Sequence, residues 1–139
     1  MLDSTVFDCN VLTLPIIHNR AGNITALNNS IDIPFDVNRV YYLYDIPGGE
    51  GRGGHAHREL QQLIVAVSGS FDITIDDGHD KKTVFLNRPY FGLHIVSGIW
   101  RDLANFSSGA ICLVLASHTY DSNDYIRNYG EFIQMKTCK

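Results

Sequence analysis

Short apolar runs separated by turn signals follow one another along most of the chain. Within residues 71–76, Phe71, Ile73 and Ile75 alternate with polar residues, which is the period of a strand with one buried face. The Asp-Gly pair at 77–78 then predicts a hairpin turn, because glycine tolerates positive φ. Further strands are predicted at residues 40–44, 62–67, 83–86, 93–96, 103–106 and 110–116. Strand starts about every 8–12 residues predict an all-β protein, either an antiparallel sandwich or a barrel.

Two segments depart from this pattern. Residues 121–132 are predicted to form a short helix of a turn or two, with Ser122 as its N-cap and an apolar face packed on the barrel. Residues 6–35 are loop-like, with weak strand signals at 11–17 and 24–27, and a peripheral segment of this kind could cross to a second subunit. We expect Asp76 and Asp77 to be solvated turn residues.

The length of 139 residues fits one domain spanning 1–139, and 45% hydrophobic against 19% charged residues is typical of a globular chain. A net charge of −4 argues against nucleic acid and membrane partners, because both need a basic face. The longest apolar runs are too short to cross a bilayer. Cys9, Cys112 and Cys138 share no metal or redox spacing, which favours reduced thiols in the cytoplasm.

The segment richest in chemistry is the glycine-rich stretch 48–54 together with the His55-Ala-His57 that follows it. Residues i and i+2 of a strand point to one face, so His55 and His57 project side by side. Two convergent imidazoles suit a metal site, or a pair in which one is a base and the other an acid or an orienting group. Two surface or core histidines without a task are the remaining interpretation.

The spacing around this pair resembles the first motif of the cupin superfamily. The glycines at 49 and 69 and both histidines have the motif's spacing, but Gln62 stands where the motif supplies a carboxylate ligand. Arg101 stands where the second cupin motif normally contributes a histidine. An amide removes a negative charge, and a guanidinium puts a fixed cation where the ion would lie. We therefore expect no bound metal and histidines that are free to move protons.

A narrower resemblance covers about residues 20–133. It is carried by Pro34-Phe35, Arg39-Val-Tyr-Tyr42, Arg52-Gly, His55-Ala-His57, Asp76-Asp-Gly78, Gly92-Leu93, Ile99-Trp100, Phe106-Ser107, Val114-Leu-Ala-Ser117 and Tyr125-Ile126. These motifs are similar to those of the sugar 3,4-ketoisomerases of the WxcM-like group, which act on dTDP-4-keto-6-deoxyglucose in routes to 3-amino sugars of surface glycans such as the O-antigen of lipopolysaccharide. The resemblance implies a cupin jelly-roll barrel, a homodimer that exchanges its N-terminal segment (about residues 1–35), a dTDP-linked 4-keto-6-deoxy sugar as ligand, and no cofactor.

The resemblance also implies roles for single residues. His57 is expected to take the proton from carbon 3 of the sugar, and His55 to assist by returning a proton at carbon 4. Arg39 and Arg52 are expected to neutralise the diphosphate or to orient the sugar.

Removing a proton beside a ketone makes an enediolate, whose oxygen charge needs nearby donors. Arg101 and either Tyr41 or Tyr42 are candidate donors, and Tyr41 shares the face of an inward-pointing Arg39. The assignment of substrate-binding residues is completed by Gln62, His94 and Trp100, with a structural role as the alternative for His94 and core filling as the alternative for Trp100.

The identity of the product is less strongly indicated by the sequence. Arg101 favours the gluco-configured 3-keto sugar, whereas Ala21, near a second determinant, lacks the large side chain expected with that product. Three other functions remain open: a 3,5-epimerase-like cupin on the same substrate, a metal cupin such as a dioxygenase, and a non-catalytic module that binds sugar nucleotides.

Overall fold

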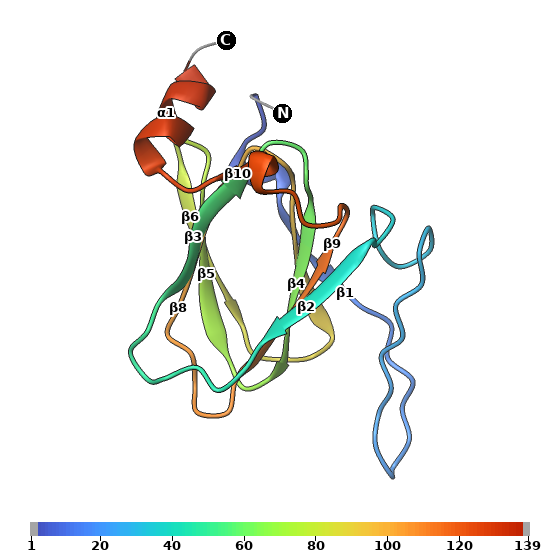
Figure 1. Cartoon of the computed structure of the whole chain (residues 1–139). Coiled ribbons are helices and arrows are strands. Elements are labelled where there is room, and N and C mark those ends of the chain that lie inside the picture. The colour runs from blue at the N-terminus through green and yellow to red at the C-terminus, as the bar shows by residue number, and fades with distance from the viewer. Residues whose placement is uncertain (1–2, 138–139) are drawn as a thin grey trace.

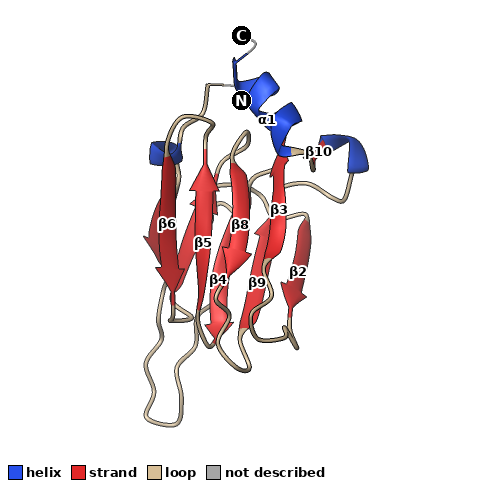
Figure 2. Ribbon diagram, turned by 90° about the vertical axis from the view of Figure 1, so that its left-hand side faces the viewer, coloured by secondary structure: helices blue, strands red, loops and turns tan. Residues whose placement is uncertain are grey.

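The computed structural model describes residues 3–137, whose strands form two five-stranded antiparallel sheets that face each other as a jelly-roll barrel (Figures 1 and 2). The first sheet has the order β1 (Asn10–Thr13), β7 (Phe91–Ile95), β4 (Gln62–Ser68), β9 (Ile111–Ala116) and β2 (Arg39–Leu43). The second has the order β10 (Tyr125–Ile126), β3 (Arg52–His57), β8 (Trp100–Ala104), β5 (Phe71–Asp76) and β6 (Lys81–Leu86). The all-β prediction is confirmed, and each predicted strand after residue 40 lies within three residues of an observed one.

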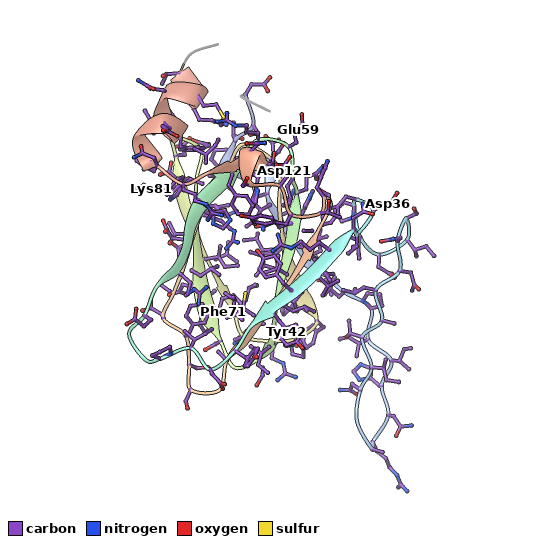
Figure 3. All side chains as sticks on the ribbon, viewed as in Figure 1. Asp36, Tyr42, Glu59, Phe71, Lys81 and Asp121 are labelled. Carbon is purple, nitrogen blue, oxygen red and sulfur yellow. The ribbon has the colours of Figure 1, made fainter. Side chains whose placement is uncertain are left out.

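β4, inside the first sheet, is buried on both faces over residues 62–66. Along β4, Ile64 and Ala66 point between the sheets into the main core, while Leu63 and Val65 point outward and pack with the N-terminal segment. This double burial explains why β4 reads as a continuous apolar run instead of an alternating one. In β5, by contrast, every second residue enters the core, and Phe71 lies between the sheets (Figure 3).

The predicted helix at 121–132 is wrong in its position. A 3₁₀ turn, η2 (Ser122–Asp124), is capped by the side chain of Asp121 and not by Ser122. The next two residues form β10, in which Tyr125 pairs with His57 and Ile126 with Ala56. The helix α1 (Tyr129–Thr137) begins only after this strand. Helical spacing was misleading here because pairing with β3 outweighs local helix propensity.

Asp76 and Asp77 were expected to be solvated, and the structure corrects this, since their exposed fractions are 3% and 5%. Asp76 accepts hydrogen bonds from the Gly78 amide at 2.7 Å and from the Tyr129 hydroxyl at 2.6 Å. Asp77 accepts a bond from the Val6 amide at 2.9 Å. The two turn carboxylates therefore tie the β5–β6 hairpin to both ends of the chain.

The buried Lys136 strengthens the same junction. Its Nζ donates to the Ser4 carbonyl at 2.7 Å, to the Ser4 hydroxyl at 3.1 Å and to the Gly98 carbonyl at 2.9 Å. The Gly98 amide in turn donates to the His57 carbonyl at 2.7 Å. The C-terminal helix, the N-terminal residues and the loop before β8 thus meet at one end of the barrel, where Figure 1 shows α1 and the N-terminus together.

The N-terminal segment contributes one short strand and a projecting arm. β1 pairs with β7 and overlaps the first part of the strand signal at 11–17. Beyond it, Ile17 and Ile24 form only an isolated antiparallel bridge, and residues 24–27 form no strand. The arm extends away from the barrel (Figure 1). Among residues 3–137, none of the helices combines the length and apolar character that a membrane crossing requires.

We predict that Lys136→Met lowers the free energy of unfolding by about 1–3 kcal/mol, because two buried carbonyl groups lose their donor while the aliphatic stem is kept. Urea denaturation measures the change. Lys82→Met on the exposed edge of β6 is the matched control, with an expected change within about 0.5 kcal/mol. Equal losses at the two positions would contradict the role assigned to Lys136.

Candidate active site

A bulge at the start of β3 sets the position of both histidines. Arg52 pairs with Leu103 and His55 with Arg101, so between these two pairs β3 has one residue more than β8. Gly53 has φ +83°, and a Cβ there would lie 2.7 Å from Arg101 Nη1. A Cβ on Gly54 would lie 2.8 Å from a carboxylate oxygen of β8. Glycine is favoured at both positions because the side chains of Arg101 and Asp102 fill the space that a Cβ would need, and at 53 also because of the positive φ.

His55 and His57 lie on one face of β3, as the spacing predicted, and that face points into the barrel, where both side chains are buried. Their ring centroids are 4.9 Å apart, and the planes are nearly perpendicular at 88°. Ala56, between them, points outward into the cluster under α1. The interpretation as two surface histidines is therefore wrong.

His57 is oriented by Asp124, which the sequence analysis missed. The Asp124 carboxylate lies 3.1 Å from His57 Nδ1 and also accepts the backbone amides of Glu59 and Leu60 at 2.8 and 3.2 Å. A carboxylate only accepts, so Nδ1 carries the proton and Nε2 carries the lone pair. Within residues 3–137, His57 Nε2 is buried without a hydrogen-bond partner. The sequence did not indicate Asp124 because residues 121–132 were predicted to form a helix, and because no motif includes this position.

His55 is oriented by Arg101, which donates a hydrogen bond to the imidazole, whereas Asp124 accepts one from His57. Arg101 Nη2 lies 3.3 Å from His55 Nε2, and a guanidinium has no acceptor, so Nε2 must accept this bond. The same Nη2 donates to the Tyr41 hydroxyl at 3.1 Å, across from one sheet to the other. Tyr41 therefore faces inward, as strand parity predicted.

Both imidazoles are held neutral. Burial, followed by the charge of Arg101, lowers the pKa of His55 to about 2. The same two causes lower the pKa of His57, although Asp124 opposes them through its charge and its hydrogen bond. At neutral pH, His57 thus presents an uncharged imidazole with a free Nε2 lone pair to the interior.

Gln62 and Arg101 complete the polar lining. Gln62 is 2% exposed, and its Nε2 donates to the Tyr41 hydroxyl at 3.1 Å. The Gln62 carbonyl oxygen and the Nε and Nη1 of Arg101 are buried without partners among the described residues. One acceptor and two donors, like His57 Nε2, are therefore buried without a partner among the described residues.

Tyr125 covers the histidines from the side of β10, a contact that the sequence did not predict. Its ring centroid lies 5.0 Å from that of His55 and 4.3 Å from that of His57. Its hydroxyl accepts a hydrogen bond at 3.1 Å from Arg39 Nη1, and Arg127 lies 4.2 Å over its ring. Arg39 thus joins the first sheet to the second at the end of the barrel marked by Glu59 and Asp121 in Figure 3.

Two predicted substrate-binding residues lie outside this space. His94 alternates with the core residues Leu93 and Ile95, so it points outward, where its Nε2 meets Gln61 at 2.8 Å and its ring lies 5.8 Å from that of Phe35. Trp100 likewise lies on the other face of β8 from Arg101.

Trp100 packs at 5.7 Å from the ring of Phe132, and its indole donates to Asp102 at 3.1 Å. Core filling, the alternative interpretation for Trp100, is therefore correct. Arg52 lies exposed at the beginning of β3, three residues before His55, so its role as a diphosphate ligand stays a prediction.

The donor set does not fit the metal site of a cupin. An ion at the two histidines would have a neutral amide in place of a carboxylate, and the Arg101 guanidinium already lies on His55 Nε2. Residues 3–137 hold no cluster of three His, Cys, Asp or Glu side chains with metal-binding geometry. The geometry instead joins one neutral base to several hydrogen-bond donors, which suits proton transfer next to an oxygen that becomes charged.

Comparison with known proteins gives one consistent result. The model of the family described as WxcM-like, C-terminal (FdtA), matches residues 7–137. The TDP-4-oxo-6-deoxy-α-D-glucose-3,4-oxoisomerase of Aneurinibacillus thermoaerophilus is 38% identical over 122 residues, which cover 88% of each chain.

Two solved structures are similar over nearly their whole length. The TDP-quinovose 3,4-ketoisomerase of Campylobacter jejuni is 45% identical with a TM-score of 0.87, covering 91% of this chain and 98% of that one. A histidine-to-asparagine mutant of the 3,4-ketoisomerase QdtA of Thermoanaerobacterium thermosaccharolyticum, in complex with TDP-4-keto-6-deoxyglucose, is 34% identical with a TM-score of 0.94, covering 97% and 98%. The chain therefore belongs to the WxcM-like family, and it is an enzyme of the isomerase class.

Proposed function

We propose that the protein is a 3,4-ketoisomerase that converts TDP-4-keto-6-deoxyglucose into the TDP-linked 3-keto-6-deoxyhexose by metal-independent acid–base catalysis. The observation that carries the proposal is the buried Nε2 of neutral His57, which faces the same interior as the unpaired donors of Arg101. The similarity to a QdtA mutant in complex with TDP-4-keto-6-deoxyglucose supports the choice of substrate.

In the proposed reaction, His57 Nε2 takes the proton from carbon 3. The electron pair of that bond forms a double bond to carbon 4, and the carbonyl pair moves onto the oxygen of carbon 4. The hydroxyl of carbon 3 then loses its proton to become the new carbonyl, while carbon 4 and its oxygen each gain a proton. Two protons leave and two arrive, so no oxidant or reductant is needed.

His55 assists in a different way from the one first expected. Its Nε2 accepts a hydrogen bond from Arg101 and its pKa is strongly lowered, which makes it a weak candidate for proton return. We assign it the task of fixing the guanidinium beside the reacting oxygens. The gluco product requires carbon 4 to be protonated on the ring face opposite to the one from which His57 takes the carbon-3 proton, so the proton at carbon 4 comes from a donor other than His57.

The finer assignments follow the sequence predictions. Arg101 supports the gluco product, as does the similarity to an isomerase named for TDP-quinovose, a 6-deoxyglucose derivative. Arg39 and Arg52 would bind the diphosphate. The sugar would be destined for a 3-amino sugar of a surface glycan, and the enzyme would work in the cytoplasm, where free thiols such as buried Cys9 and Cys112 persist.

We also propose a homodimer in which a second copy covers the outer face of the first sheet. A cavity of about 610 Å³ lies under the N-terminal arm, and another of about 630 Å³ lies beside β2. Both are lined by Val67 and Leu113, so the apolar face is continuous between them. Val40 and Tyr42 on the edge strand β2 are more than half exposed, which is unusual for side chains of this size on a face without a partner.

The central test is an NMR time course with TDP-4-keto-6-deoxyglucose in heavy water. We expect the carbon-3 proton of the substrate to be lost and deuterium to appear at carbon 4 of the 3-keto product, because carbon 4 is reprotonated by a group that exchanges its proton with solvent. His57→Asn should abolish both while keeping the affinity for TDP. Exchange at carbon 5 with the carbonyl unmoved would instead identify an epimerase, and TDP binding without any exchange would identify a binding module.

Asp124→Asn should lower kcat by roughly 10²-fold or more, because the imidazolium formed at His57 loses its counter-charge. Neutral His57 is the active form, so kcat/KM falls as the pH drops through its pKa, which burial places below 6.5. Asp124 raises that pKa, so its removal should move the acid limb of the profile to lower pH. Asp121→Asn, in the same turn, should leave the profile in place; a shifted profile there, or an unshifted one for Asp124→Asn, contradicts the assignment.

The dimer is tested by sedimentation of the protein and two variants. We expect the wild type and Phe85→Asp, on the exposed side of β6, to sediment at twice the chain mass. Tyr42→Asp places a charge in the proposed interface and should weaken self-association measurably. A monomeric wild type would refute the interface.

A further inference from the structure

The hydroxyl of Tyr41 is held by two donors inside the barrel. Gln62 Nε2 and Arg101 Nη2 each donate to its oxygen at 3.1 Å. Both nitrogens act only as donors, so the Tyr41 oxygen accepts twice. Its own O–H is therefore directed at neither of these two groups and can donate to a third partner inside the barrel.

The Gln62 amide also carries an acceptor, its carbonyl oxygen. While Nε2 is engaged by Tyr41, the carbonyl oxygen is buried and has no hydrogen-bond partner in the described part of the chain. Gln62 and Tyr41 lie on β4 and β2, the two strands that flank β9, and both side chains point toward the second sheet. One hydroxyl donor and one carbonyl acceptor are thus held side by side, across from His57.

This pair matches the reacting part of a keto sugar. A carbon-4 ketone needs a donor, and the neighbouring carbon-3 hydroxyl needs an acceptor. We propose that Tyr41 and Gln62 together recognise the α-hydroxy ketone of the substrate: the Tyr41 O–H donates to the oxygen of carbon 4, and the Gln62 carbonyl accepts from the hydroxyl of carbon 3. The inference rests on the proposed function and adds to it the residues that hydrogen-bond to the oxygens of carbons 3 and 4.

The same geometry gives a reason for glutamine at position 62. A carboxylate there would have no donor, so it would accept the Tyr41 hydrogen and turn that donor away from the sugar. The amide keeps the hydrogen directed at the oxygen on which charge grows as His57 removes the proton. A donor placed in this way acts mainly in the transition state, and loss of one typically lowers kcat by about 10²–10³-fold.

Gln62→Glu tests the pair because glutamate has nearly the same shape as glutamine. Its carboxylate, however, accepts a hydrogen bond from Tyr41, whereas the amide donates one. We expect kcat to fall by about 10²–10³-fold with the affinity for TDP unchanged. Each protein is assayed with and without a chelator, since a carboxylate at position 62 beside two histidines restores a potential metal site. Gln61→Glu, one residue earlier and in contact with His94 outside the barrel, is the matched control and should keep wild-type kcat.

A double-mutant cycle with Tyr41→Phe distinguishes this role from a general disturbance of the site. If Gln62 acts through Tyr41, Gln62→Glu should have little further effect in the Tyr41→Phe protein. Multiplying effects, or wild-type kcat in Gln62→Glu, would overturn the inference while leaving the isomerase intact. A wild type that neither loses the carbon-3 proton nor forms the 3-keto product would instead remove the proposed function, and the inference with it.

Discussion

The contact of Arg101 with His55 and Tyr41 is the interaction on which the rest of the site depends. It joins the two sheets through one buried guanidinium, and it fixes which nitrogen of His55 carries the proton. Gly53 makes room for the guanidinium, since a Cβ at this position would lie 2.7 Å from Arg101 Nη1. The bulge, the paired imidazoles and the inward tyrosine are consequences of placing a guanidinium at the centre of a cupin-type barrel.

The second constraint comes from the two ends of the chain. Asp124 and Tyr125 reach His57 from a short segment that returns across β3, and Lys136 holds the helix that follows against Ser4 and Gly98. The Gly98 amide then binds the His57 carbonyl. The strand that carries both histidines is therefore held from both sides by residues far away in sequence, which favours a rigid His57 over a mobile one.

The sequence predicted those features that depend on local periodicity and on motif spacing. Alternation placed the strands, and the i, i+2 spacing correctly placed His55 and His57 on the same face, although it did not decide that this face points inward. The same alternation placed Tyr41 correctly, because Tyr41 lies two residues after Arg39 and therefore shares the inward face assigned to it. His94 was assigned to the pocket although Leu93 and Ile95, its apolar neighbours on both sides, already indicate the opposite face.

What the sequence did not predict depends on long-range pairing. Asp124 and Tyr125 acquire their roles only when β10 adds to β3, and a two-residue strand leaves no periodic signal. Trp100 fills the cluster under α1 because the helix begins at Tyr129 and brings Phe132 over it, and not where helical spacing suggested. In both cases the register of the C-terminal segment, which no local pattern encodes, decided the outcome.

The electrostatics of Arg101 act on both partners of the proposed proton transfer. A cation near His57 makes the imidazole a weaker base, which alone would slow proton removal. The same cation stabilises the enediolate that removal creates, and in a buried site both effects are stronger than in water. Asp124 offsets the first effect without reducing the second, because it lies on the far nitrogen of His57 and away from the sugar. A metal ion would stabilise the enediolate as well, but it would take the Nε2 lone pair that the reaction needs. A guanidinium stabilises the anion while leaving the base free, which gives a physical reason for an arginine and a glutamine at the positions where cupins carry metal ligands.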